Sequence, residues 1–121
     1  MTQTSSYFVP TPGQSRLSTD DARDQIDAVL RAECPRLLQE QKPTRTANVA
    51  VELDRTGDVQ RARITQPSGD ERMDEVFGAV AARLHFQPPA AADVKNDSAP
   101  GRLRMGYSCA KDAAVGTIEI L

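Results

Sequence analysis

This 121-residue sequence has no tryptophan, one histidine, two cysteines and few aromatic residues, which make up 4% of the chain. With so few aromatic side chains, its hydrophobic core must rest on leucine, valine, isoleucine and alanine. A single imidazole makes neither a metal site nor a catalytic triad, and the spacing of Cys34 and Cys109 matches no metal motif. We therefore expect no metal ion and no other cofactor.

The sequence also lacks a large excess of charge and long hydrophobic runs. Fifteen basic and 17 acidic residues give a formal net charge of −2, which does not favour nucleic acid as a partner. No apolar run approaches the roughly 20 residues of a membrane-spanning helix, and no apolar signal segment follows Met1. A chain of this length suffices for one domain with a hydrophobic core of its own.

The first part of the chain divides into an arm and a helix. Residues 1–17 are rich in Thr, Ser, Gln, Pro and Gly, which predicts a flexible N-terminal arm ahead of a domain over residues 18–121. Hydroxyl and acidic residues at positions 18–21 predict a helix start. Apolar residues at helical spacing follow and place Cys34 on the buried face. Pro35 is expected to kink or restart this helix.

The middle of the chain predicts a β-hairpin. Residues 47–54 alternate apolar and polar, which is typical of a half-buried strand. Residues 54–58 are turn formers, and Gly57 can adopt the positive φ that a tight turn requires. A second strand is expected over residues 59–66, where Pro67 stops it.

A second amphipathic helix follows the hairpin. Its apolar stripe consists of Met73, Val76, Phe77, Val80, Ala81 and Leu84. Four acids open the helix: Asp70, Glu71, Asp74 and Glu75. We interpret them as solvent-exposed residues that favour a helix N-terminus, in preference to a cation site. Gly78, on the flank of the stripe, is expected to permit close approach to the sheet.

The chain closes with a third strand and a terminal segment of strand character. The inward set of the third strand is Leu103, Met105, Tyr107 and Cys109, and the outward set is Arg102, Arg104, Gly106 and Ser108. Val115–Leu121 suggests a further short strand at an edge. The fold class is therefore α+β: an antiparallel three-stranded sheet of order 2-1-3, with a short fourth strand left open, packed against two helices.

On the solvent face of this sheet, we expect charges of opposite sign to alternate between strands. Glu52 and Asp54 of the central strand should lie between arginines of both neighbouring strands. These arginines are Arg61, Arg63, Arg102 and Arg104. The interleaved acids favour a structural role for them over phosphate binding.

Several segments together resemble a known family. They are Val49-Ala50-Val51-Glu52-Leu53-Asp54, Gly57-Asp58-Val59, Ser68-Gly69-Asp70, Met73-Asp74-Glu75 and Phe86-Gln87-Pro88-Pro89. In this order they resemble the C-terminal domain of TonB-type energy transducers, over about Pro35 to Cys109. The related TolA C-terminal domain is also similar, with an amphipathic helix ahead of its first strand.

The resemblance implies a non-enzymatic periplasmic domain, anchored to the inner membrane if the native chain is longer. Such domains dock an outer-membrane or periplasmic partner by pairing its extended peptide with a sheet edge. By position, that edge consists of Arg102, Leu103, Arg104, Met105, Gly106, Tyr107 and Ser108. The alternative is a stand-alone structural or assembly domain of the envelope, with the edge covered by Val115–Leu121. The sequence contains no nucleophile paired with a base and no Gly-rich phosphate loop. Nothing in it therefore favours an enzyme or a small-molecule substrate.

The two cysteines are either buried free thiols or a disulfide. Cys34 and Cys109 are both expected on inward faces of elements that pack together. Because the similar domains face the oxidising periplasm, we predict that they form a disulfide.

Overall fold

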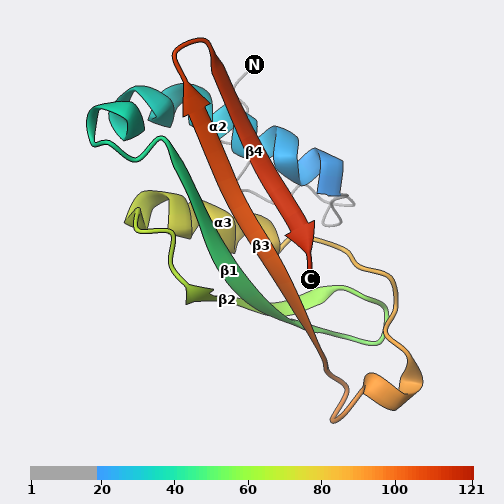
Figure 1. Ribbon diagram of the computed structural model, residues 1–121. Coiled ribbons are helices and arrows are strands. Elements are labelled where there is room, and N and C mark those ends of the chain that lie inside the picture. The colour runs from blue at the N-terminus through green and yellow to red at the C-terminus, as the bar shows by residue number, and fades with distance from the viewer. Residues whose placement is uncertain (1–18) are drawn as a thin grey trace.

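The structure, a computed structural model, describes residues 19–121, so the arm predicted over residues 1–17 lies outside the described residues. Its elements in chain order are α2 (Thr19–Gln39), β1 (Thr44–Leu53), β2 (Val59–Gln66), α3 (Glu71–Ala81), the short 3-10 helix η1 (Ala91–Asp93), β3 (Ala99–Ala110) and β4 (Ala113–Ile120). Figure 1 shows the sheet with both long helices behind it. The α+β class is thereby confirmed.

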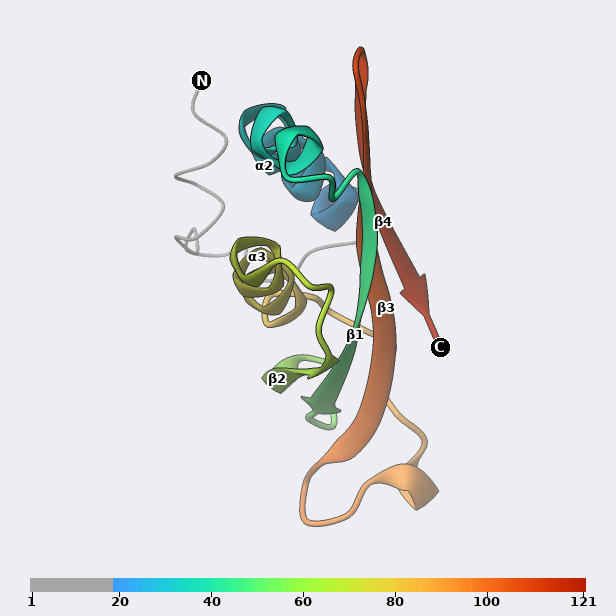
Figure 2. The ribbon, with the colours of Figure 1, turned by 60° about the vertical axis from the view of Figure 1, so that its left-hand side comes forward.

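The four strands form one antiparallel sheet in the order β2-β1-β3-β4. The expected order 2-1-3 is confirmed, and the terminal segment is a full strand that pairs with β3. Both long helices lie on the same side of the sheet, and within residues 19–121 the opposite face carries no long helix (Figure 2). No helix within residues 19–121 has the length and apolarity to cross a membrane.

A kink or a restart was predicted at Pro35, and the restart is wrong, because helix α2 continues through Pro35 without a break. Pro35 and Arg31 both lie on the exposed side of the helix, where water can satisfy the carbonyl that loses its helical donor. On the opposite side, Leu30, Cys34 and Leu37 are buried against the sheet. Burial of this face before and after the proline keeps the helix in one piece.

The β1–β2 turn is held against the segment that follows α3. Gly57 has φ +95°, as the turn required, and its carbonyl accepts a hydrogen bond from the Phe86 N–H at 2.8 Å. A Cβ at Gly57 would collide with the Phe86 carbonyl, so glycine is needed for space as well as for conformation. This contact places the Phe-Gln-Pro-Pro segment beside the hairpin.

The core lies between the helices and the inner face of the sheet. Its largest fully buried side chains are Tyr107, Phe77, Ile26, Leu30, Leu37, Met73, Leu103, Met105, Val29, Val49 and Val76. Gly78 was predicted to permit close approach to the sheet. That prediction is wrong, because a Cβ at Gly78 would meet nothing within 4 Å. Helix α3 is capped at its N-terminus by Asp70, whose side chain accepts a hydrogen bond from the Met73 N–H at 2.9 Å.

Candidate functional site

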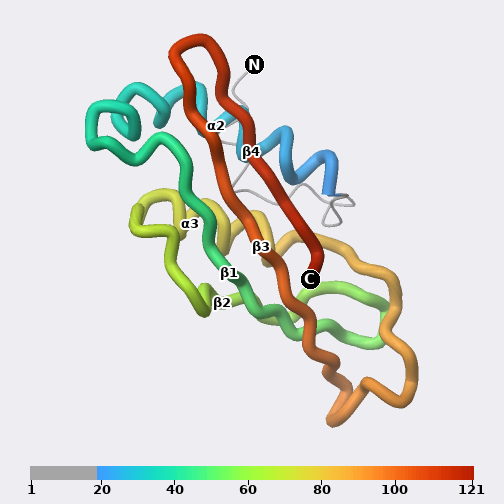
Figure 3. The backbone as a smooth tube through the Cα atoms, viewed as in Figure 1, coloured from blue at the N-terminus to red at the C-terminus, as the bar shows by residue number. Residues whose placement is uncertain are grey.

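The strand predicted to bind a partner, β3, is paired on both sides. It pairs with β1 from Ala99 to Ser108 and with β4 from Leu103 to Ala110. The tube in Figure 3 shows the chain turning back after β3 and running beside it to the C-terminus. The edge over residues 102–108 is therefore covered by the chain's own tail, because a short turn lets β4 satisfy the unpaired backbone groups.

The side chains of the predicted edge point to two different environments. Leu103, Met105 and Tyr107 are buried in the core, whereas Arg102, Arg104 and Ser108 are exposed on the opposite face. Gly106, which belongs to the outward set, is buried. A Cβ there would lie 2.7 Å from the Arg45 carbonyl oxygen and 3.0 Å from Thr117 Oγ1, so the chain itself fills this space.

The backbone of β3 also has two sides, which the hydrogen bonds at its ends identify. The Leu121 N–H donates to the Arg102 carbonyl at 3.0 Å, and the Cys109 N–H donates to the Pro43 carbonyl at 2.6 Å. In an antiparallel ladder, the N–H and C=O of one residue face the same neighbour. The even-numbered residues 102–108 therefore face β4, and the odd-numbered ones face β1.

Strand β4 is held from its outer side by α2. Gly116 is its one buried residue, and its outward-facing N–H donates to the carboxylate of Asp27. A Cβ at Gly116 would lie 2.6 Å from Cγ2 of Ile26, so the helix packs directly on the strand backbone. Sequence reasoning missed this contact, although an isolated glycine in a strand pattern is a signal of close backbone approach.

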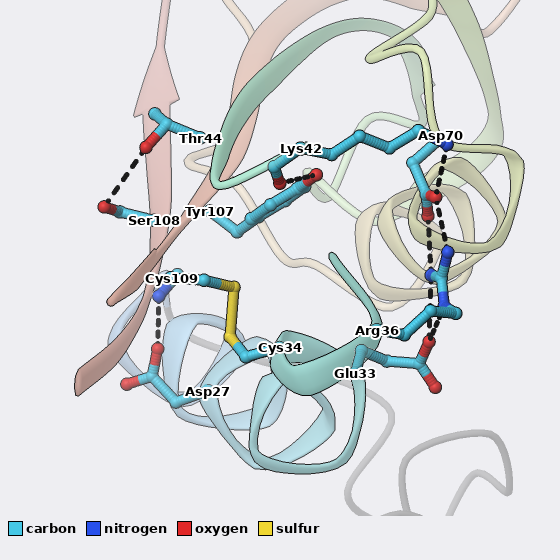
Figure 4. Close-up of a disulfide and its surroundings, with 11 residues drawn as sticks. Asp27, Glu33, Cys34, Arg36, Lys42, Thr44, Asp70, Tyr107, Ser108 and Cys109 are labelled. Carbon is cyan, nitrogen blue, oxygen red and sulfur yellow. Dashed lines mark hydrogen bonds and ion pairs between the residues drawn. A yellow bond between two sulfur atoms is a disulfide. The ribbon is translucent and has the colours of Figure 1, made fainter. Parts of the chain in front are cut away.

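A disulfide joins Cys34 of α2 to Cys109 of β3, which confirms the predicted pairing (Figure 4). The two Cα atoms lie 5.6 Å apart, and both side chains are buried. The bond spans 75 positions of the sequence. In the chain-entropy model, a loop of that length stabilises the folded state by about 4 kcal/mol.

A second connection between elements centres on Asp70. Its two carboxylate oxygens accept hydrogen bonds from Arg36 Nη1 and Nη2 at 2.9 and 3.0 Å, and Lys42 Nζ lies 3.2 Å from Oδ1 (Figure 4). The Asp70 side chain is 2% exposed, so the expectation that all four acids of this helix point to solvent is wrong. The pair ties α2 to the start of α3.

The charges of this cluster stabilise one another. Hydrogen bonding to Arg36 holds the pKa of Asp70 well below its usual range, and Asp70 in turn raises the pKa of Arg36 and of Lys42. Glu33 adds a further ion pair to Arg36 at 3.0 Å. A general base works best with a pKa near the operating pH. The pKa of Asp70 is shifted away from neutral pH, so the arrangement suits a structural connection between α2 and α3.

Two further polar side chains, those of Tyr107 and His85, also make contacts between elements. Tyr107 donates its hydroxyl to the Lys42 carbonyl at 2.9 Å, and burial raises the pKa of Tyr107 to about 12. His85 Nδ1 lies 2.7 Å from Asp58 Oδ1. Within residues 19–121, no group of three or more His, Cys, Asp and Glu side chains is placed to hold a metal ion.

Comparisons with known proteins were made by sequence and by structure. No protein-family model, no curated protein and no solved structure matches this chain.

Proposed function

We propose that this chain is a non-enzymatic protein-interaction domain of the cell envelope, similar to the C-terminal domains of TonB and TolA energy transducers. It docks an extended segment of an outer-membrane or periplasmic partner by strand addition to β3. The observation that carries this proposal is that β3 is covered by a strand held chiefly through its backbone. The Cys34–Cys109 disulfide supports an oxidising compartment such as the periplasm.

Strand β4 contributes few side chains to the core. Val115 and Ile120 are 49% and 57% exposed, and Ala114 and Ile118 are only partly buried. Because burial of apolar surface is the dominant stabilising term, removal of β4 should cost the fold less than removal of β1 or β3. Its backbone hydrogen bonds can be made equally well by another extended peptide.

A partner strand in the place of β4 would meet a defined surface. Its backbone would pair with residues 102, 104, 106 and 108, which face that side of β3. Arg102 and Arg104 would lie beside its outward side chains and favour an acidic or polar partner. The core side chains Leu103, Met105 and Tyr107 would support the strand from below without contacting solvent.

A second function is favoured by the pairing of β4 itself. Eight residue pairs join β3 to β4, and Asp27 accepts the outward amide of Gly116. A tail fastened in this way suits a stand-alone structural or assembly domain of the envelope that recruits no strand. The two functions differ in whether β4 leaves β3.

The test uses the chain's own terminal strand as a probe. A protein ending at Asp112 is mixed with a fluorescent peptide of residues 113–121, and binding is followed by anisotropy. We expect saturable binding to the shortened protein and weaker, measurable binding to the full chain, in which β4 competes. A folded shortened protein that does not bind would contradict strand addition at β3. Binding to the shortened protein alone would favour the stand-alone domain.

A matched pair of peptides separates strand pairing from non-specific adhesion. Thr117 lies opposite Gly106, whose backbone faces β4, so an N-methyl group on Thr117 removes a hydrogen bond to β3. An N-methyl group on Ile118 faces away from β3 and should leave binding nearly unchanged. In the protein, Arg104→Pro should weaken binding for the same reason. A proline at Met105 would instead disturb pairing with β1.

A further inference from the structure

On the sheet face opposite the helices, two arginines flank a small residue, one on each side. Ala50 in β1 lies opposite Arg63 of β2 and also opposite Arg102 of β3. All three point away from the core, toward the face on which the described part of the chain has no long helix (Figure 2). The row therefore reads Arg-Ala-Arg, where an acid had been expected between the arginines.

The remaining charges of this face are already paired. Arg61 Nη1 lies 3.4 Å from Glu52 Oε2, and Arg104 Nη1 lies 2.8 Å from Glu119 Oε1. Within residues 19–121, neither Arg63 nor Arg102 has an ion pair with an acid. Two positive charges thus remain uncompensated at the centre of the face.

A hollow lies between these two arginines. It has a volume of about 640 Å³, and its lining includes Ala50, Glu52, Arg61, Arg63, Arg102 and Leu121. We call it the arginine groove. Neighbouring strands lie roughly 4.8 Å apart, so the backbones that carry Arg63 and Arg102 are separated by about 10 Å. The methyl group of Ala50 leaves the space between them open to a ligand.

We propose that the arginine groove binds a carboxylate side chain of an acidic protein segment. Guanidinium groups recognise carboxylates through paired hydrogen bonds, and two flexible arginines at this separation can approach one carboxylate from both sides. The site uses side chains of the sheet face and no strand edge. It therefore goes beyond the strand addition proposed above and requires no displacement of β4.

The charge pattern favours an acidic protein over nucleic acid or an anionic membrane. Nucleic acid binding depends on many phosphate contacts along a basic track, and anionic membranes attract clusters of four to eight basic residues. Here Glu52 lines the groove and Glu119 neutralises Arg104. Two uncompensated arginines suit a short acidic segment.

The test uses the full chain and a fluorescein-labelled hexaglutamate peptide, with hexaglutamine as the uncharged probe. We expect hexaglutamate to bind and hexaglutamine not to bind. The affinity for hexaglutamate should fall as the salt concentration rises from 50 to 200 mM. Arg63→Gln with Arg102→Gln should weaken binding at least fivefold. The matched control, Arg31→Gln with Lys111→Gln, removes the same charge from exposed positions on α2 and on the β3–β4 turn. It should change binding less than twofold.

A second variant tests the hollow independently of charge. Ala50→Leu keeps both arginines and fills the space between them, so it should also weaken hexaglutamate binding. Equal loss in the control double variant would overturn the proposal, as would unchanged binding in Ala50→Leu. Tighter binding of a dodecathymidylate or of phosphatidylserine vesicles, lost in the Arg63 and Arg102 double variant, would overturn the choice of an acidic protein segment.

Discussion

Strands β1 and β4 flank the same strand, β3, yet they are held in different ways. β1 buries Ala47, Val49, Val51 and Leu53, whereas β4 buries Gly116, which has no side chain. Both pair with β3 through antiparallel backbone hydrogen bonds. The difference teaches that pairing in a sheet and anchoring in the core are separate properties. β1 has both, and β4 has mainly the first.

The helical layer repeats this contrast in two carboxylates. Asp70 is buried, accepts a paired interaction from Arg36 and caps α3. Asp27 is partly buried and accepts the amide of Gly116. Asp70 joins two helices within the core region, whereas Asp27 satisfies one backbone amide at the outer edge of the sheet.

The largest effect should come from truncating a core side chain of β1. Leu53→Ala is expected to lower the free energy of unfolding by about 3 kcal/mol, because it leaves a cavity under the sheet. The matched change in β4, Ile120→Ala, should cost less than about 1 kcal/mol, since that side chain is already mostly in water. Urea unfolding at neutral pH measures both. Similar losses in the two variants would show that β4 is anchored as firmly as β1.

An intermediate effect is expected at the buried carboxylate. Asp70→Asn should lower the free energy of unfolding by about 2 kcal/mol at pH 7, because Arg36 loses its ionised partner. The pKa of Asp70 is lowered in the folded state, so this stabilisation is present above the ordinary carboxyl pKa of about 4 and declines as pH falls below it.

The pH dependence supplies the measurement. Unfolding of the wild type and of Asp70→Asn is compared at pH 7 and pH 3, where the gap should be smaller. Asp27→Asn, which retains an oxygen acceptor for Gly116, is the control and should cost about 0.5 kcal/mol or less. A gap that widens at pH 3 would contradict the assignment of Asp70 as the stabilising anion.

The smallest effects distinguish two glycines by the space around them. Gly116→Ala should cost about 1 kcal/mol and increase amide hydrogen exchange in β4, because the added methyl group meets Ile26. Gly78→Ala should stabilise by about 0.5–1 kcal/mol, since its site in α3 is open and alanine favours helix. If Gly116→Ala leaves exchange in β4 unchanged, α2 does not hold the strand by this contact.

The local patterns of the sequence were sufficient to predict the first three strands and the side chains that form the core. Alternation in β1 and β3 predicted which side chains face inward, and the helical stripe placed Met73 and Phe77 in the core. The turn chemistry around Gly57 predicted its positive φ. Each of these follows from the geometry of a few consecutive residues, which a single sequence contains.

The candidate site was less accessible from the sequence. Residues 102–108 were assigned to a strand with the correct facing, but the sequence left open whether the tail covers them. Asp70 was assigned to the solvent, because its partner Arg36 lies 34 positions away and no local pattern relates the two. The contact of Asp27 with Gly116 joins residues 89 positions apart.

The sequence by itself determined the approximate positions of both long helices and of the first three strands, which of their faces are apolar and that both cysteines point inward. Only the tertiary structure decided the register of the strands. It shifts between Glu52 and Leu53 in β1 and sets Ala50, not an acid, between Arg63 and Arg102. Periodicity is a short-range property of the backbone, whereas register, edge coverage and buried charge pairing depend on which distant segments meet.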